Sequence, residues 1–138
     1  MLLFVIFEEN VMSDHLNDLL QLDLTARLNY SIKEMVKNNC IWILTDEHGC
    51  MMLNTEDEDC VPVWPSAELA NLWINNDWQH CRAEAIDLTT WFSRWTSGLM
   101  EDDLALLVFP LETGEGMVIF PDEFDDLLTQ QKQKIPRK

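Results

Sequence analysis

The stretch CVPVWPSAELANLW, from Cys60 to Trp73, decides the fold because it predicts an abrupt exit from a strand into a helix. Pro62 removes a backbone donor, which predicts that this strand lies at a sheet edge or carries a bulge. Pro65 favours extended backbone at Trp64, so the strand is expected to end there. Ser66 is a favourable N-cap for the helix that follows. We therefore interpret this stretch as a structural corner, with the tryptophan rings filling the space beneath it.

The segments on either side of this corner predict a single α+β domain over residues 12–131. Some segments carry apolar residues at helical spacing, and others are short β-rich runs bounded by turn residues. We expect a mainly antiparallel sheet of about five strands with helices packed on it. The predicted helices are one capped by Ser13 or Asp14 that ends at Gln21, one started by Asp23 or Thr25 that ends at Asn38, Ser66–Trp73, one capped by Asp87 or Thr89 that ends at Gly98, and one that starts at Pro121. The predicted extended segments are Cys40–Leu44, Cys50–Leu53, Cys60–Trp64, Cys81–Leu88, Leu104–Pro110 and Met117–Phe120.

The two ends of the chain differ in character from this domain. Residues 1–11 begin with seven apolar residues, which are too few to span a bilayer, and no basic region or cleavage site accompanies them. Glu8-Glu9 can be encoded by a purine-rich GAGGAG two codons before the ATG of Met12, as in a ribosome-binding site. We therefore expect residues 1–11 to be a non-native extension and synthesis to start at Met12. Residues 132–138 form a short basic tail.

Charge is the strongest signal in the composition. The chain of 138 residues has a net charge of −16, and the segment Asn38–Gln131 holds nineteen acidic residues but only two basic ones, Arg82 and Arg94. Such a field repels nucleic acid and anionic membranes, and it attracts basic proteins and cations. We expect neither nucleic acid nor membrane binding. The charge is explained either by solubility alone, which is the more common cause, or by a basic protein partner.

The four cysteines indicate a reducing compartment. Cys40, Cys50, Cys60 and Cys81 form no C-x-x-C pair and lie in or beside apolar runs, where a free thiol packs as a small hydrophobe. We expect them to be reduced, in a cytoplasmic protein.

The sequence shows no recognisable catalytic or metal-binding pattern. His80 and Cys81 are adjacent, so regular backbone would direct their side chains apart rather than into a catalytic dyad. The histidines and cysteines lack zinc-binding spacing. A calcium loop counted from Asp57 would place Pro62 where an EF-hand requires glycine. We predict no catalytic residue, no metal site and no cofactor.

The leading hypothesis is therefore a non-catalytic, acidic interaction module that binds a basic partner, with an immunity-like protein as one version. Acidic side chains beside surface tryptophans are typical of such contacts, whereas Trp91 and Trp95 are expected in the core. An enzyme with a site centred on Cys60, Cys81 or His80 and a weak divalent-cation binder are the alternatives. The predicted contact residues are Glu56, Asp57, Glu58, Asp59, Trp73, Asp77, Trp78, Glu101, Asp102 and Asp103.

Four segments resemble the bacterial family known as domain of unknown function 2750. They are WILTDEHG (residues 42–49), VPVWPSAELAN (61–71), IDLTTWFSRW (86–95) and LVFPLETGEGMVIFPDEF (107–124), in that order. The resemblance covers roughly Leu24–Leu128, and the tryptophan-proline element is its most specific part. The resemblance implies a small intracellular bacterial protein, and it brings no assigned activity and no catalytic residues.

Overall fold

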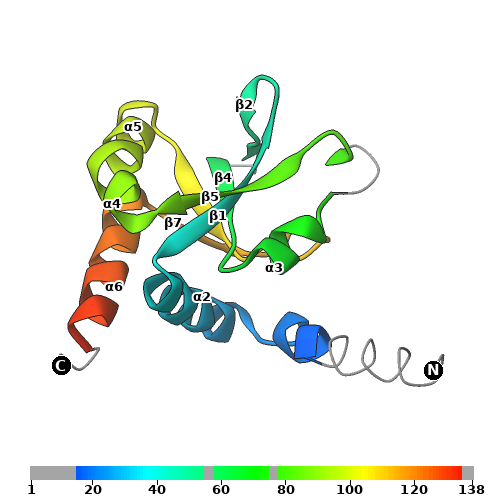
Figure 1. Ribbon diagram of the computed structural model, residues 1–138, viewed down its shortest axis with the longest axis horizontal. Helices are drawn as coiled ribbons and strands as arrows, with labels where there is room; N and C mark the ends of the chain where they lie inside the picture. Colours follow the sequence, from blue (N-terminus) through cyan, green and yellow to red (C-terminus); the bar gives the residue numbers. More distant parts are fainter. Residues whose placement is uncertain (1–14, 55–57, 75–77, 135–138) are drawn as a thin grey trace.

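The computed structural model describes residues 15–54, 58–74 and 78–134, and its helices lie beside two small sheets (Figure 1). A short helix at residues 15–20 precedes the first labelled element. The labelled elements, in chain order, are α2 (Leu24–Asn38), β1 (Cys40–Asp46), β2 (Gly49–Cys50), β3 (Leu53–Asn54), β4 (Asp59–Val63), α3 (Ala67–Asn71), β5 (Arg82–Asp87), α4 (Leu88–Thr90), a π-helical turn (Trp91–Trp95), α5 (Thr96–Glu101), β6 (Ala105–Val108), β7 (Met117–Ile119) and α6 (Pro121–Lys134).

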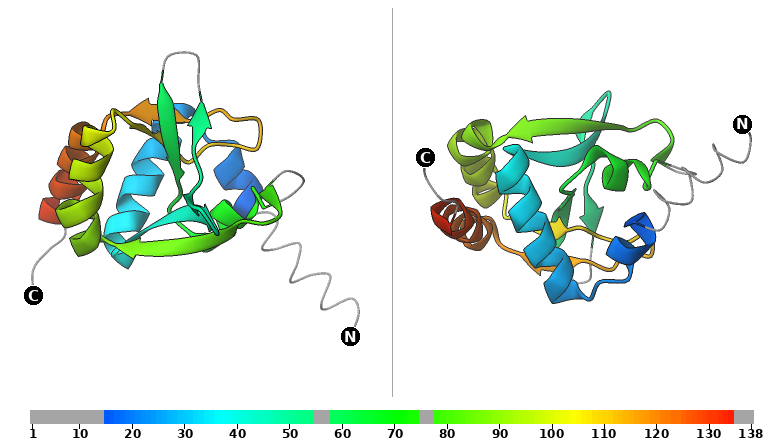
Figure 2. Two further views of the ribbon diagram at one scale, coloured as in Figure 1. Left: turned by 90° about the horizontal axis from the view of Figure 1, so that it is seen from above. Right: turned by 60° about the horizontal axis from the view of Figure 1, so that its bottom comes forward.

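The strands form two sheets that meet at one bridge. The first sheet has the order β2-β1-β5 and is antiparallel, and the second has the order β3-β4-β6-β7, with β4 and β6 parallel. Trp42 and Trp64 each donate the backbone N–H to the carbonyl of the other, at 3.0 and 2.9 Å, and join the sheets. The two views in Figure 2 show α6 and the helix formed by α4 and α5 packed together at one end of the molecule, beside α2.

The predicted α+β class is confirmed, but the strands are arranged differently from the expectation. We predicted about five strands in one sheet, whereas the described residues form seven short strands in two sheets. The difference arises at Cys50–Leu53, which was expected to be one hairpin strand. The structure divides it between β2 and β3, which belong to different sheets. Four consecutive apolar residues have no period-two pattern, so their sequence does not indicate which neighbour they pair with.

Pro62 lies where β4 changes partner. The strand is internal in its sheet, so the predicted edge position is wrong for the strand as a whole. On one side, the Val63 carbonyl accepts a hydrogen bond from Phe109 N–H at 2.8 Å. The backbone N–H and C=O groups of alternate residues in β4 point to the opposite side of the strand. On that side, β3 pairs with β4 as far as Cys60, and the bridge to β1 is at Trp64. Pro62 lies in the gap between these two partners, where its missing N–H leaves no hydrogen bond unmade.

The corner after Pro62 has the predicted structure. Trp64 is fully buried, and the Ser66 hydroxyl caps α3 by accepting a hydrogen bond from Leu69 N–H at 3.2 Å. The helix ends at Asn71, earlier than expected.

The helix after Asp87 also keeps its predicted apolar stripe. Trp91 is fully buried and stacks on Trp95 with 5.5 Å between the ring centroids. Gly98 does not end the helix as predicted, because α5 continues to Glu101. Within the described part of the chain, none of the helices combines the length and the apolar character that crossing a bilayer requires.

Candidate functional site

A groove rimmed by carboxylates opens where α6 begins, and we call it the acidic groove. It has a volume of about 440 Å³. Its apolar lining residues are Met100, Leu104, Phe120 and Pro121, and its acidic lining residues are Glu58, Asp103 and Asp122. Met100 and Phe120 remain 51% and 50% exposed, which is unusual for large apolar side chains that lie close together.

Two chain reversals shape this groove. After α5, Asp103 adopts a left-handed backbone with φ 56°, and Leu104 N–H donates to the Leu99 carbonyl at 2.9 Å. This turn holds Met100 and Asp103 on the same rim. On the other rim, Phe120 directly precedes Pro121. The Phe120 carbonyl accepts the first hydrogen bond of α6, from Phe124 N–H at 3.0 Å. The fixed φ of a proline at the first helical position sets this entry into α6.

The groove has the chemistry of a contact surface for a cationic, partly apolar segment. Glu58, Asp103 and Asp122 are the charged members of its lining, so every described charge in the lining is negative. Exposed acids continue along the chain at Asp59 and Glu101. Apolar groups surrounded by charges of one sign are typical of protein interfaces, in which the apolar groups provide affinity and the charges provide orientation.

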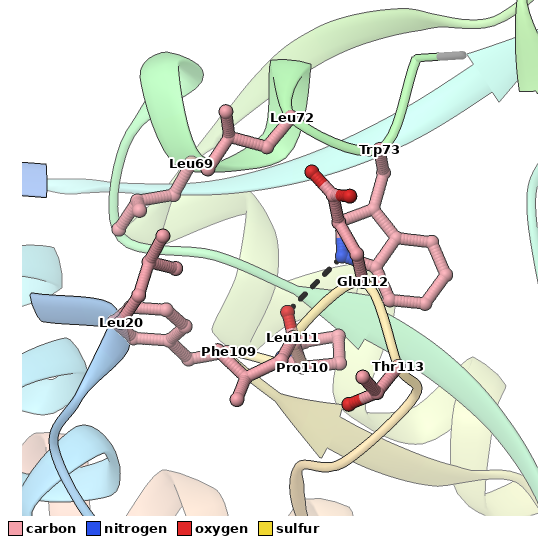
Figure 3. Close-up of a pocket in the computed structure, with 9 residues that line it drawn as sticks. All are labelled: Leu20, Leu69, Leu72, Trp73, Phe109, Pro110, Leu111, Glu112 and Thr113. Atoms are coloured by element: carbon pink, nitrogen blue, oxygen red, sulfur yellow. Dashed lines mark hydrogen bonds between the residues drawn. The ribbon is translucent and has the colours of Figure 1, made fainter. Parts of the chain in front are cut away.

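A second hollow lies beside α3, and we call it the tryptophan pocket. Its volume is about 300 Å³. Leu69, Leu72 and Trp73 approach it from α3 and the residues just after that helix, and the segment Phe109–Thr113 approaches from the β6–β7 connection (Figure 3). Trp73 Nε1–H donates to the Pro110 carbonyl at 3.1 Å, and Trp64 Nε1–H donates to the same oxygen at 3.4 Å.

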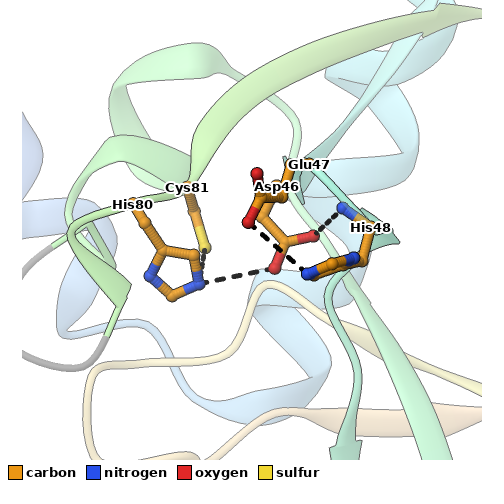
Figure 4. A network of polar contacts seen from close by, with 5 residues as sticks. All are labelled: Asp46, Glu47, His48, His80 and Cys81. Atoms are coloured by element: carbon orange, nitrogen blue, oxygen red, sulfur yellow. Dashed lines mark hydrogen bonds and ion pairs between the residues drawn. The ribbon is translucent and has the colours of Figure 1, made fainter.

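Polar side chains meet at a third place, beside the turn between β1 and β2 (Figure 4). His80 Nε2 lies 3.4 Å from Asp46 Oδ2 and 3.9 Å from Cys81 Sγ. The prediction that His80 and Cys81 point apart is therefore wrong. It assumed regular backbone, but both residues precede β5 in a turn that Cys81 N–H closes on the Trp78 carbonyl at 3.1 Å.

This polar cluster lacks the geometry of an activated thiol. The same imidazole nitrogen faces both Asp46 and Cys81, whereas a relay requires one nitrogen toward the nucleophile and the other toward the orienting group. Burial raises the pKa of the Cys81 thiol, and the Asp46 carboxylate raises it further. A raised pKa disfavours the thiolate, which is the nucleophilic form.

The other three cysteines are no more activated than Cys81. Burial is also the main cause that raises the pKa of Cys40, Cys50 and Cys60. All four cysteines are free. Among the residues that the structure describes, no three or more His, Cys, Asp and Glu side chains are arranged so that they could hold a metal ion.

Comparison with known proteins identifies the family. A family model described as a protein of unknown function (DUF2750) matches residues 28–128. The chain belongs to the DUF2750 family. No curated protein matches the chain significantly. The match of the family model to residues 28–128 confirms the resemblance seen in the sequence. The region shared with DUF2750 contains every described residue that lines the acidic groove, and all of the tryptophan pocket except Leu20.

The structure of this DUF2750 protein divides the predicted contact residues between different places. Glu58 and Asp103, which are 45 positions apart in the sequence, line the acidic groove together. Asp59, Glu101 and Asp102 are exposed next to them in the chain but do not line it. Glu56, Asp57 and Asp77 lie outside the described residues.

Trp73 and Trp78 lie away from the groove and are more buried than we expected. The rings of Trp64, Trp73 and Trp78 form a series, with 5.9 and 5.4 Å between successive centroids. Both Trp73 and Trp78 are partly buried against the core.

Sequence reasoning missed the apolar members of the groove. We took Phe120 for the end of a strand and did not place Met100 in any site. The only available signal was that Phe120 directly precedes the helix-initiating Pro121, which indicates a chain reversal at that position.

Proposed function

We propose that this DUF2750 protein is a non-catalytic interaction protein that binds a basic partner protein through the acidic groove. The observation that supports this proposal most is the combination of two half-exposed apolar side chains, Met100 and Phe120, with carboxylates around them. A basic segment that carries an apolar side chain would satisfy both features at once.

The two parts of the groove have different energetic roles. Fully burying a large apolar side chain contributes about 1.5–3 kcal/mol, so covering the exposed halves of Met100 and Phe120 would provide about 2 kcal/mol together. The carboxylates and the net charge of −16 would speed the encounter with a cation and disfavour anionic partners, including nucleic acid and anionic membranes. Long-range steering of this kind weakens as salt rises.

The free cysteines support a reducing location for this interaction. All four thiols are unpaired in the structure. Because disulfides form in oxidising compartments, we assign the protein to the cytoplasm in this proposal. Neutralisation of a basic toxin is one form of the proposed function, and a toxin gene next to this one would favour it.

Affinity capture with matched variants tests the proposal. The immobilised protein is exposed to a cell lysate at low and at moderate salt, and retained proteins are compared across variants. The apolar test variant is Met100→Ser with Phe120→Ser, and its control is Val118→Ser, which removes a 42% exposed apolar side chain that does not line the groove. The charge test variant is Asp103→Asn with Asp122→Asn, and its control is the exposed Glu84→Gln.

We expect a basic protein to be retained by the unchanged chain and by both controls, less at the higher salt concentration. Both groove variants should lose it. Retention by the groove variants equal to that of the controls would exclude the acidic groove as the contact. Absence of any retained protein at both salt concentrations would contradict the interaction function itself.

A further inference from the structure

The tryptophan pocket is a preformed cavity, because hydrogen bonds fix the segments that line it. The Pro110 carbonyl accepts from the indole N–H groups of Trp73 and Trp64, which orients both rings. Gly114 N–H donates to the Leu111 carbonyl at 2.7 Å, and Leu111 N–H donates to the Glu115 carbonyl at 2.8 Å, so the connection between β6 and β7 is a closed turn.

A buried arginine holds this turn against α2. Arg27 is 2% exposed, and its Nη1 donates to the Phe109 carbonyl at 3.1 Å and to the Glu115 carbonyl at 3.0 Å. Its guanidinium also lies 5.8 Å from the centroid of the Phe109 ring. Phe109 has a left-handed backbone with φ 48°, a strained conformation for an aromatic residue that these contacts maintain. A cavity held in this way does not have to reorganise before it binds a ligand.

The lining of the pocket indicates the class of ligand. Leucine side chains at positions 20, 69, 72 and 111 surround the cavity with Trp73. Glu112 is the charged group among the described lining residues (Figure 3). The volume of about 300 Å³ is at the lower end of the range for small-molecule sites.

We propose that the tryptophan pocket binds a small amphiphilic amine, with its apolar body among the leucines and Trp73 and its ammonium group at the Glu112 carboxylate. The apolar lining disfavours a polar metabolite. Glu112 and the negative field of the whole chain disfavour an anion. An amine with an apolar body satisfies both parts of the lining. This site is separate from the acidic groove, and it does not depend on the function proposed for that groove.

Titration with three probes of similar shape tests the site. They are 2-phenylethylammonium, the neutral 2-phenylethanol and the anionic 3-phenylpropanoate, and ethylammonium serves as a cation without the apolar body. Binding is followed by the NMR signal of the Trp73 indole N–H, which is assigned from its absence in Trp73→Phe. We expect saturable shifts with 2-phenylethylammonium, weaker binding of 2-phenylethanol, and no saturation with 3-phenylpropanoate or ethylammonium.

Variants then separate the pocket from the general field of the protein. Glu112→Gln should weaken the binding of 2-phenylethylammonium about two- to fivefold, the range for an exposed ion pair, and leave 2-phenylethanol unchanged. The control Glu115→Gln changes an exposed residue of the same turn that does not line the pocket, so binding should be unchanged. Met100→Ser with Phe120→Ser, in the acidic groove, should also leave amine binding unchanged.

Three results would overturn the proposal. The first is the absence of saturable shifts at Trp73 with any probe. The second is equal binding of the amine and the alcohol, because the cation would then contribute nothing. The third is an equal effect of Glu112→Gln and Glu115→Gln, which would show that net charge acts and that contact at Glu112 does not.

Discussion

Replacing Arg27 by methionine should destabilise the protein and loosen the wall of the tryptophan pocket. Methionine keeps an unbranched apolar stem for packing but removes the guanidinium. The Phe109 carbonyl then loses its donor, and the Glu115 carbonyl is left with the hydrogen bond from Leu111 N–H. The lost hydrogen bond to Phe109 is buried and the lost one to Glu115 is partly buried, so water can replace the donor only at Glu115.

The size of the effect follows from these contacts. An unpartnered buried carbonyl costs about 1–3 kcal/mol, and the Phe109 carbonyl becomes such a group. The Glu115 carbonyl adds about 1 kcal/mol because it loses one of its two hydrogen bonds, and loss of the cation–π contact adds about 1–2 kcal/mol.

Removing a desolvated charge works in the opposite direction. Among the described residues the buried Arg27 Nε has no partner, and relief of this burial returns about 2 kcal/mol. The net loss in free energy of unfolding is about 1–4 kcal/mol, with a midpoint of about 2.5 kcal/mol. This loss corresponds to a decrease in melting temperature of roughly 10 °C for a chain of this length.

Urea denaturation measures this loss directly. The control is Lys33→Met, which removes an exposed cation from the same helix and should change the free energy of unfolding by about 0.5 kcal/mol or less. Tryptophan fluorescence and thermal melting provide independent readings of the same transition. A loss below about 1 kcal/mol for Arg27→Met, or one equal to that of the control, would show that the arginine does not hold the turn.

Two further predictions concern a crowded glycine and a buried carboxyl group. Gly116→Ala should destabilise the protein by about 1–3 kcal/mol, because the added Cβ would lie 3.0 Å from Pro110 Cα. In α5, the Cβ added by Gly98→Ala meets nothing within 4 Å, so this control should stabilise the protein by about 0.5–1 kcal/mol. Urea denaturation of both variants tests the difference, and equal effects would contradict it. Burial raises the pKa of the Asp125 carboxyl group, although the Thr96 hydroxyl donates a hydrogen bond to it at 2.6 Å. The folded state therefore binds the carboxyl proton more tightly than the unfolded state does. Ionisation of Asp125 then lowers the stability of the folded state as the pH rises through the raised pKa. Asp125→Asn should therefore stabilise the protein more at pH 7 than at pH 4, relative to the unchanged chain at each pH, and a difference that does not depend on pH would refute this assignment.

Local features of the structure were predictable because neighbouring residues determine them. Asp23 and Asp87 cap their helices by accepting hydrogen bonds from Ala26 and Thr90 N–H at 2.8 and 2.7 Å, as their positions before apolar stripes indicate. The corner at Trp64 follows from the fixed φ of the two prolines beside it. The order of helical and extended segments likewise predicts an α+β protein, and the excess of acidic residues predicts a negative field.

Arg27 shows where local reasoning fails. Leu24 shares the helical spacing of the apolar residues of α2, yet it is 40% exposed, whereas Arg27 is buried. The helix turns this face toward the β6–β7 connection, more than 80 residues away, whose carbonyl groups accept from the guanidinium. No pattern within α2 records the position of those carbonyls.

The sequence alone determined where the helices begin and where the corner at Trp64 lies, because caps, prolines and apolar periodicity act within a few residues. It also determined the sign of the electrostatic field, since this depends mainly on the numbers of charged residues. Tertiary structure decided which segments meet: Glu58 with Asp103 in the acidic groove, the parallel pairing of β4 with β6, and Asp46 with His80. These contacts depend on packing between segments that are distant in the sequence. Many pairings of such segments would bring compatible residues together, and only the packing of the complete core favours one of them.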